Sequence, residues 1–439
     1  MYKPITIGPI KISAISKAEF LAEVKRRVSS DEQTFVTTPY SEFLYAALRS
    51  GEVRDLLAKA DIAIADGIGI FWAERFLSKP LAAKSHYGKI VEAWFGAIIT
   101  GARILLTPSY LYQNIPEKIV GAEVFFDLCA LAEKENFSVF LLNDWSDSAQ
   151  KTAELLKIKY PKLKIAGVSN KKIDDQSVKV DIAEVSPDML FVGYGNIKQE
   201  RWIAEHLKDL PVKMAMGVGG TFDYAAGNKL RPPKFVRRIG LEWLFRLFTQ
   251  PRRVPRIYRA TIGLIVSLIR YKVFKSYPFR SNAVAVVVNE DNKILLFKRI
   301  VAPPKNGQSR VFLDNYWQFP QGGIDEGEEL LSAAARELEE ETGITSVKPL
   351  LTSNFLNSYE WLHGNRPVVF NQRPYNGQTQ QTVLFRFFGD NSEIVVDGRE
   401  FEEYEWLSVK DVLQRIAPER KHHAENVLKE LSEYLKKSA

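Results

Sequence analysis

Six short apolar runs recur through the first half of this 439-residue chain, and they constrain its fold more than any other feature. Polar or amphipathic stretches separate them, and residues 146–160 and 197–207 among these have a helical pattern. Buried strands that alternate with helices are typical of a parallel α/β sheet. We therefore expect such a sheet from the runs at residues 35–38, 62–65, 103–106, 138–142, 189–193 and 214–218.

The residues that follow these runs are candidates for a binding site, because parallel sheets bind ligands beyond the carboxyl ends of their strands. Thr38 ends the first run, Asp66 follows the second, and glycine-rich turns stand at 193–196 and 217–220. A carboxylate at Asp66 can accept a proton from a sugar hydroxyl as a general base. A helix cap or turn is the alternative interpretation of this aspartate. Residues 1–250 contain no Asp-x-Asp, so a metal-clamped sugar-nucleotide site of that kind is not expected.

Five segments in this region together resemble the WecG/TagA/CpsF glycosyltransferases, glycosyltransferase family 26. They include ADIAIADGIGIFWA and, most strongly, RPPKFVRRIGLEWLFRLFTQPRRVPRIYR. The resemblance implies a Rossmann-like fold, a nucleotide-sugar donor, a polyprenyl-diphosphate-linked acceptor and surface polysaccharide synthesis at the inner face of the bacterial membrane. It implies no metal cofactor for this domain. By the same resemblance Asp66 is the catalytic base, and the substrate-binding residues are Thr38, Gln199, Arg231, Arg237 and Arg246.

The sequence also departs from the family pattern. Tyr40, Lys118, Glu123 and Ile197 stand where the family has other residues, and residues 82–115 look inserted. Lysine in place of arginine loses the bidentate geometry that suits phosphate.

A strongly basic segment follows, with 14 Lys and Arg but only two acids in residues 220–280. Aromatic residues lie among these bases, which suits an anionic membrane surface. Single-stranded nucleic acid is a second possibility, and an aromatic core with a solvated basic face is a third. The resemblance favours the membrane, because the acceptor there is a lipid. The apolar run at 260–269 is too short to cross a bilayer but could form an interfacial helix.

The last part of the chain contains a glutamate-rich helical pattern after residue 328. An apolar stripe is formed by Leu331, Ala334, Ala335 and Leu338, and acids with the spacing i, i+3, i+4 are Glu337, Glu340 and Glu341. Carboxylates that converge repel one another unless a cation is present, and oxygen ligands suit Mg²⁺ or Mn²⁺. A solvated acidic face is the alternative interpretation. A hairpin is expected from residues 282–288 and 293–298.

The complete spacing from Gly322 through Glu328 to RELEEETGI at 336–344 resembles the Nudix hydrolases, across about residues 281–436. The resemblance implies an α/β/α sandwich and metal-dependent hydrolysis of a nucleoside diphosphate-linked compound. By it the metal ligands are Gly322, Glu337, Glu340 and Glu341. Flanking segments resemble the branch of RNA pyrophosphohydrolases and diadenosine polyphosphate hydrolases. Candidate phosphate contacts are Lys298, Arg299 and Arg420, and Glu341 with Glu402 or Glu403 is expected to be catalytic.

We therefore expect a bifunctional enzyme with three parts: a glycosyltransferase domain at 1–250, a basic membrane-contacting linker at 251–280 and a Nudix domain at 281–439. The single cysteine, Cys129, fits a reducing cytosol, and no signal peptide is recognised at the N-terminus. A peripheral position on the inner face of the cell membrane is expected, and an oligomer is possible. In the alternative interpretation the first domain is catalytically weakened and anchors or regulates a Nudix pyrophosphohydrolase. In a third, the Nudix fold only senses a nucleotide.

Overall fold

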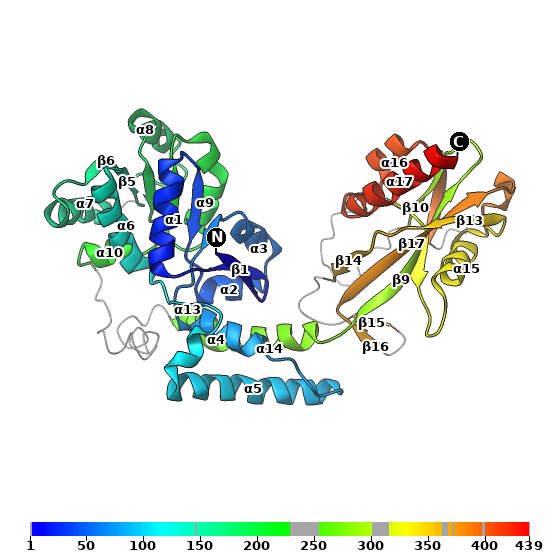
Figure 1. Cartoon of the computed structure of the whole chain (residues 1–439), viewed down its shortest axis with the longest axis horizontal. Coiled ribbons are helices and arrows are strands. Elements are labelled where there is room, and N and C mark those ends of the chain that lie inside the picture. Colours follow the sequence, from blue (N-terminus) through cyan, green and yellow to red (C-terminus); the bar gives the residue numbers. More distant parts are fainter. Residues whose placement is uncertain are drawn as a thin grey trace. The chain divides into compact units, whose positions relative to one another are not determined.

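The computed structural model describes residues 2–144, 147–228, 254–300, 316–361, 368–370, 373–396 and 400–438. The chain divides into two compact units, Met1–Ser276 and Tyr277–Ala439 (Figure 1). The predicted domain limits at residues 250 and 280 stay predictions. Residues 264–275 pack inside the first unit, against its other helices.

A six-stranded parallel sheet forms the centre of the first unit, with strand order β4-β3-β8-β7-β5-β6. Its strands are β3 (Thr34–Thr37), β4 (Ile62–Ala63), β5 (Ser138–Leu142), β6 (Lys164–Ser169), β7 (Met189–Val192) and β8 (Met214–Gly217). A separate antiparallel hairpin is made by β1 (Lys3–Ile7) and β2 (Ile10–Ala14). The predicted parallel α/β fold is therefore confirmed.

Helices cover both faces of this sheet. The described helices of the unit are α1 (Lys17–Ser29), α2 (Ser41–Ala47), α3 (Gly51–Ala58), α4 (Ile68–Leu77), α5 (His86–Leu106), α6 (Gly121–Glu135), α7 (Ser148–Lys159), α8 (Ser177–Val185), α9 (Lys198–His206), α10 (Thr221–Ala225), α13 (Val254–Tyr258) and α14 (Leu264–Lys275), not all of which touch the sheet. Successive residues of a strand point to opposite faces. Accordingly Val139 packs with α1, α6 and α7, whereas Phe140 packs with α8 and α9.

In this unit one predicted strand was wrong, and three strands were missed, namely β6 of the sheet and the two strands of the separate hairpin, β1 and β2. The run at 103–106 is the end of helix α5, in which Ile104 is buried while Leu105 and Leu106 are exposed. A short apolar run cannot by itself distinguish a strand from part of a helix. Strand β6 lies at the edge of the sheet and is mostly half-buried, so its sequence shows no continuous apolar run.

An eight-stranded sheet forms the centre of the second unit. Its strands are β9 (Phe279–Val288), β10 (Ile294–Arg299), β11 (Trp317–Gln318), β12 (Gln321–Gly323), β13 (Val347–Thr352), β14 (Asn357–Glu360), β17 (Gly377–Phe387) and β18 (Phe401–Leu407). The central strands β9 and β17 run parallel, and the other pairs are antiparallel. The predicted hairpin is β9 and β10, and a small separate hairpin joins β15 (Val368–Phe370) to β16 (Arg373–Tyr375).

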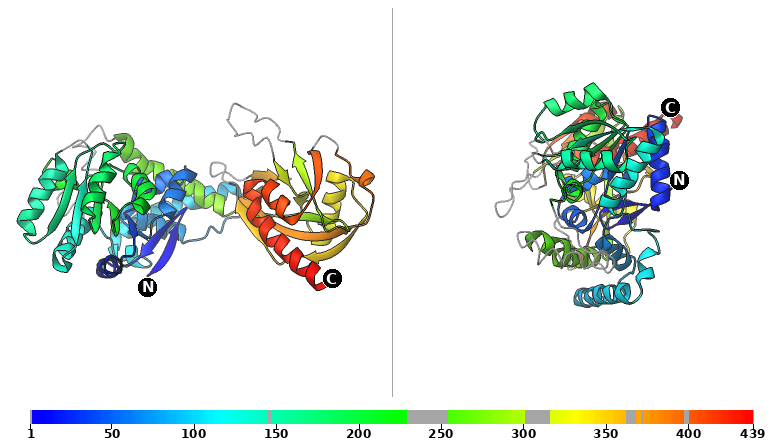
Figure 2. Two further views of the ribbon diagram at one scale, coloured as in Figure 1. Left: turned by 90° about the horizontal axis from the view of Figure 1, so that it is seen from above. Right: turned by 90° about the vertical axis from the view of Figure 1, so that its left-hand side faces the viewer.

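Helices lie on both faces of this second sheet as well, which gives the expected α/β/α sandwich. Alternate residues of β9 pack against α15 (Leu330–Thr342) on one face and against α17 (Pro418–Ser438) on the other. In Figure 2, α17 is coloured red and crosses its face of the sheet. The short helix α16 (Val409–Arg415) lies beside α17.

Helix α15 contains the predicted glutamate-rich pattern and ends at a glycine. Gly343 caps it with a φ of 73°, a left-handed conformation that glycine adopts without strain. Ala334 and Leu338 are buried as expected, but Leu331 is 42% exposed and Ala333 is buried instead. The core-facing stripe is therefore narrower and slightly rotated from the predicted one.

Candidate active sites

The first candidate site lies where strands β3 and β4 end beside the start of helix α6. The Gly121 amide, in the first turn of α6, donates to Asp66 Oδ2 over 3.1 Å. A Cβ added at Gly121 would lie 3.2 Å from the same oxygen and 3.4 Å from Thr38 Oγ1. Asp66 and Thr38 thus converge on one glycine, although 28 positions separate them in the chain.

The position of Asp66 follows from the residues on either side of it. Its backbone amide donates to Pro39 over 3.0 Å, which ties it to the end of β3. Gly67 then turns the chain into α4 with a φ of 83°, a conformation that glycine tolerates. The carboxylate of Asp66 meets the amino end of α6, where unpaired N–H groups favour negative charge. This contact holds the half-buried carboxylate at the edge of the sheet where the parallel strands end.

Gln199 joins the two glycine-rich loops that follow β7 and β8. Its side-chain oxygen accepts from the amides of Gly195 and Gly219, at 3.2 and 2.9 Å. Its amide group donates to Glu200, whose other oxygen accepts from Ile197. Burial raises the pKa of Glu200 to about 7. Gln199 is itself buried, so its observed contacts fix the loops of the site.

The basic segment also contacts the residues that follow β3. Arg256 donates to Tyr40 and to Glu42, each over 2.5 Å, and so joins α13 to the start of α2. Tyr40 is one of the residues that depart from the family pattern, and this contact gives its hydroxyl a structural role. The predicted substrate contacts Arg231, Arg237 and Arg246 lie outside the described residues.

The second candidate site lies between helix α15 and strand β12. The Gln321 amide donates to Glu341 Oε2 over 3.1 Å. A Cβ at Gly322 would overlap the carboxylate of Glu337, so only glycine fits where the helix meets the strand. The structure thereby brings together three predicted ligands, Gly322, Glu337 and Glu341.

Arg336 holds the loop before α15 in place. Its guanidinium donates to both oxygens of Glu328, at 2.8 and 3.0 Å, and to the carbonyl of Gly323 at 3.0 Å. Hydrogen bonds from Arg336 lower the pKa of Glu328 to about 2. The remaining donor of Arg336 contacts Glu337 and Glu340, at 2.9 and 3.2 Å. Glu340 is exposed, so it lies outward from the other two glutamates of its motif.

Glu341 has a carboxylate neighbour that the sequence did not indicate, Glu400. Burial raises the pKa of Glu341, and the nearby charges of Glu400 and Glu337 raise it further. Burial also raises the pKa of Glu337. Among the described residues no three His, Cys, Asp or Glu side chains form a ready metal-binding group. The donor chemistry nevertheless fits a hard cation, because these oxygens repel one another without one.

The other predicted residues of the second unit lie elsewhere. Lys298 pairs with Glu402 at 2.8 Å and with Glu403 at 3.7 Å across strands β10 and β18. Arg299 is exposed at the end of β10. The structure therefore gives Glu341 the neighbour Glu400 and gives Glu403 the neighbour Lys298. The assignments of Glu403, Lys298 and Arg299 stay predictions.

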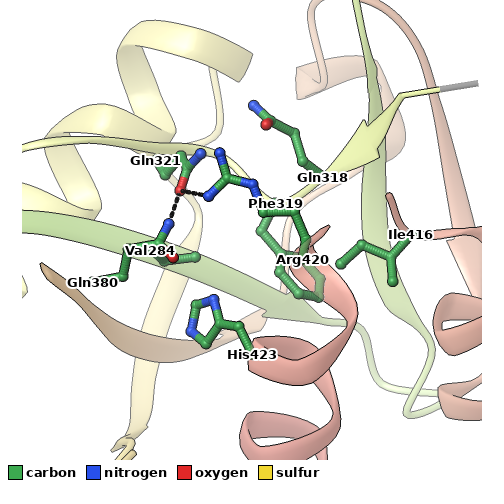
Figure 3. Close-up of a pocket in the computed structure, with 8 residues that line it drawn as sticks. All are labelled: Val284, Gln318, Phe319, Gln321, Gln380, Ile416, Arg420 and His423. Atoms are coloured by element: carbon green, nitrogen blue, oxygen red, sulfur yellow. Dashed lines mark hydrogen bonds between the residues drawn. The ribbon is translucent and has the colours of Figure 1, made fainter. Parts of the chain in front are cut away.

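A pocket opens on the same sheet beside Gln321, and Arg420 reaches into it from α17 (Figure 3). Arg420 donates to Gln321 at 3.3 Å, to the hydroxyl of Tyr359 at 3.1 Å and to that of Tyr316 at 3.4 Å. These partners are neutral, so the guanidinium charge remains available to an anion. His423 also lines the pocket, where burial lowers its pKa to about 4 and it is hydrogen-bonded to Thr382 at 2.8 Å. Sequence reasoning found Arg420 but missed His423 and Glu400.

Comparison with known proteins supports both parts of the sequence interpretation. The model of the WecG/TagA/CpsF glycosyl transferase family matches residues 5–99 and 83–277. An N-acetylglucosaminyldiphosphoundecaprenol N-acetyl-beta-D-mannosaminyltransferase of Bacillus subtilis (strain 168) is 27% identical over 223 residues, which cover 51% of this chain and 74% of that protein. A transferase of the same name from Staphylococcus aureus (strain MRSA252) is 25% identical and covers 56% of this chain and 82% of its own length.

The NUDIX domain model matches residues 278–429. An RNA pyrophosphohydrolase of Pelagibacter ubique (strain HTCC1062) is 36% identical over 160 residues, which cover 36% of this chain and 94% of that protein. Both matches fall on the units that the structure separates. The chain therefore belongs to the WecG/TagA/CpsF glycosyltransferase family through its first unit and to the Nudix family through its second, and it is a fusion of a glycosyltransferase with a Nudix hydrolase.

Proposed function

We propose that the first unit transfers an N-acetylmannosamine-type sugar from a nucleotide donor to a polyprenyl-diphosphate-linked acceptor. The names of the transferase relatives support this acceptor and sugar. The convergence of Asp66, Thr38 and the amino end of α6 is the observation that carries the proposal. The acceptor hydroxyl attacks the anomeric carbon of the donor sugar, its proton passes to Asp66, and the nucleoside diphosphate departs.

The surroundings of Asp66 suit two negatively charged groups in this reaction, the carboxylate base and the departing diphosphate. The start of α6 is also the proposed position of the departing diphosphate, because the N–H groups at a helix amino end favour negative charge. Gln199 fixes the loops after β7 and β8, which lie at the same edge of the sheet as Asp66. Arg231, Arg237 and Arg246 are proposed to meet the diphosphate or the membrane surface. Because the acceptor is a lipid, the proposed location is peripheral, on the inner face of the cell membrane.

For the second unit we propose hydrolysis of a phosphorus anhydride at the 5′ end of RNA or in a related nucleotide. The relatives named RNA pyrophosphohydrolase support this substrate class. Arg420, a half-buried cation with neutral partners, would bind a phosphate in the pocket of Figure 3. Water attacks phosphorus, the anhydride bond breaks, and Glu400 is proposed as the base that takes the proton from water.

The proposed metal-binding residues are Glu337, Glu341 and the Gly322 region, with Glu340 at the outer edge. A bound divalent cation, Mg²⁺ or Mn²⁺, would supply neutralisation of the charge that develops on the phosphate oxygens. The chain's own contribution is to hold the carboxylates in place, through the Gln321 amide and through Arg336.

One experiment tests both proposals. The full-length protein is incubated with a panel of nucleotide sugars plus a lipid-linked acceptor, and separately with 5′-triphosphate RNA and dinucleoside polyphosphates. Mass spectrometry then identifies the products. We expect one glycosylated lipid and a metal-dependent release of pyrophosphate or nucleotide. An absence of glycosylated product with an intact hydrolase would favour the alternative in which the first unit is an anchor or regulator, and metal-independent binding without turnover would favour a nucleotide sensor.

A further inference from the structure

Helix α5 exposes an almost continuous apolar face. Its outward side chains include Phe95 and Ile98, which are 62% and 64% exposed, and Leu106, which is 83% exposed. The further members of this face are Tyr87, Val91, Trp94, Ile99 and Leu105. Figures 1 and 2 show α5 at the periphery of the first unit. Soluble proteins seldom leave a contiguous apolar surface of this kind uncovered.

The opposite face of α5 fixes the helix to the unit. Its buried residues are mostly small, with Ala93, Ala97 and Thr100 followed by Ile104. These residues pack closely against α4 and α14. Small side chains therefore point inward and large apolar ones point outward, the reverse of an ordinary surface helix. Folding alone does not explain this arrangement, because it leaves the larger apolar area in water.

The charges around this face suit an anionic surface. Residues 79–112 contain four bases, Lys79, Lys84, Lys89 and Arg103, against the single acid Glu92. Glu92 accepts from the amides of Ala82 and Ala83, so it is turned toward the loop before the helix. Residues 254–275 contain no acid, and their exposed bases are Arg259 and Arg270, whereas Arg256 pairs with Glu42 and Lys272 is buried. A second copy docked through the same face would bring like charges together, which disfavours a dimer as its occupant.

The length of the helix is compatible with an in-plane position. Its 21 residues extend about 32 Å at 1.5 Å per residue. Among the described residues, no helix is long and apolar enough to cross a membrane. A helix with one apolar aromatic-rich face and flanking bases instead lies in the interface, with that face among the upper acyl chains.

We propose that α5 inserts its exposed face into an anionic bilayer and holds the first unit at the lipid surface. The proposal rests on the proposed transfer to a lipid-linked acceptor, which requires the active site to be near a membrane. The segment at 82–115 that looks inserted relative to the family is thus a docking element of this chain, in addition to the basic segment.

A variant with Phe95→Ser and Ile98→Ser tests the proposal. The matched control is Ile158→Ser with Val180→Ser, which removes two apolar side chains that are 80% and 56% exposed outside α5. Full-length proteins are sedimented with vesicles of phosphatidylglycerol and phosphatidylethanolamine. We expect the α5 variant to bind roughly a hundredfold more weakly, because two large side chains no longer enter the bilayer. The control variant should bind as the unchanged protein does, and all three should hydrolyse soluble nucleotides equally.

Equal vesicle binding by the α5 variant and the unchanged protein would overturn the proposal. So would a loss of self-association by the variant in analytical ultracentrifugation without a loss of vesicle binding, since a second copy would then be the occupant. Transfer assays separate this proposal from the proposed function. If the transfer function is correct, the α5 variant still glycosylates a short-chain water-soluble acceptor but not a long-chain acceptor embedded in vesicles. If no protein glycosylates either acceptor, the proposed function fails while the vesicle measurement still decides the role of α5.

Discussion

Glu341 has three features that a surface glutamate lacks. It is largely buried, it accepts a backbone hydrogen bond from Gln321, and its neighbours Glu400 and Glu337 are acids. Burial and like charge both favour the protonated form, so the ionised group is costly without a counter-charge. A residue with only a structural task would be better replaced by a neutral one. The arrangement is therefore best explained by a bound cation during hydrolysis.

The variant Glu341→Gln should lose hydrolysis while it keeps its fold. We expect the rate to fall by roughly two to four orders of magnitude, because one main carboxylate of the proposed metal site is removed. Thermal stability should be unchanged or higher, since a repulsive buried charge disappears and Gln is a good helix former. The matched control is Glu339→Gln, an exposed position on the same helix. Hydrolysis near the unchanged rate at saturating Mg²⁺ would contradict the assignment.

His423 should make the second unit less stable in mild acid. Burial lowers its folded pKa to about 4, whereas the unfolded value is about 6.5. Between these values the unfolded chain binds more protons, so stability is lost as the pH falls from about 6.5 to 4. The full loss is about 3 kcal/mol by linkage.

Amide hydrogen exchange in α17 and β17 measures this loss. In His423→Gln the pH dependence in that window should shrink, because Gln can still contact Thr382 without taking up a proton. The exposed neighbour provides the control, and His422→Gln should retain the dependence. An unchanged pH profile in His423→Gln would show that another group is responsible.

The relative positions of residues could be predicted where they depend on local spacing. Glu337 and Glu341 lie one turn apart on a single helix, so their sequence separation fixes their common face. Glu400 comes from the start of a distant strand, and no local pattern indicates which of three nearby glutamates turns toward Glu341. His423 was missed for a similar reason, because the sequence does not show that His423 lines a pocket while its neighbour His422 is exposed.

At the scale of elements, the amino end of α6 organises the first site. Gly121 stands there because a larger residue would press on Asp66 and Thr38 together. The apolar run at 103–106 predicted a strand, but its residues form the end of helix α5. Local hydrophobicity identified buried segments correctly in most cases. It could not anticipate an apolar face that points outward, because that face is not part of the core.

Gly121→Ala should therefore impair transfer more than stability. The new methyl group would lie 3.2 Å from Asp66 Oδ2, which must move by a few tenths of an ångström and lose its hydrogen-bond geometry. Alanine is otherwise a better helix former than glycine, so the melting temperature should change little. We expect a fall of roughly tenfold or more in the transfer rate, by analogy with other small displacements in active sites. Gly96→Ala in α5 is the control, since a Cβ there meets only the ring of Phe76 at 3.8 Å.

For the whole molecule, the two units have separate cores. The residues of each core cluster lie entirely within one unit, and each sheet is completed by strands of its own unit. Two distinct amino-acid patterns predicted this organisation, strand–helix alternation in the first unit and the Nudix spacing in the second. The limits of the basic middle segment were harder to predict. Helix α14 is rich in bases, like the rest of that segment, but its apolar residues are buried within the first unit.

Separate cores predict that the two activities can be removed independently. Asp66→Asn should abolish transfer, because an amide cannot take the acceptor proton, yet its oxygen can still accept from Gly121. Hydrolysis by the same protein should stay unchanged, and Glu341→Gln should show the reverse pattern. Asp55→Asn, at an exposed position in α3, controls for loss of a negative charge. Parallel assays of transfer and hydrolysis measure both effects in each full-length variant. If Asp66→Asn removed both activities from a folded protein, the sites would have to be coupled, whereas undiminished transfer would reduce Asp66 to a structural partner of α6.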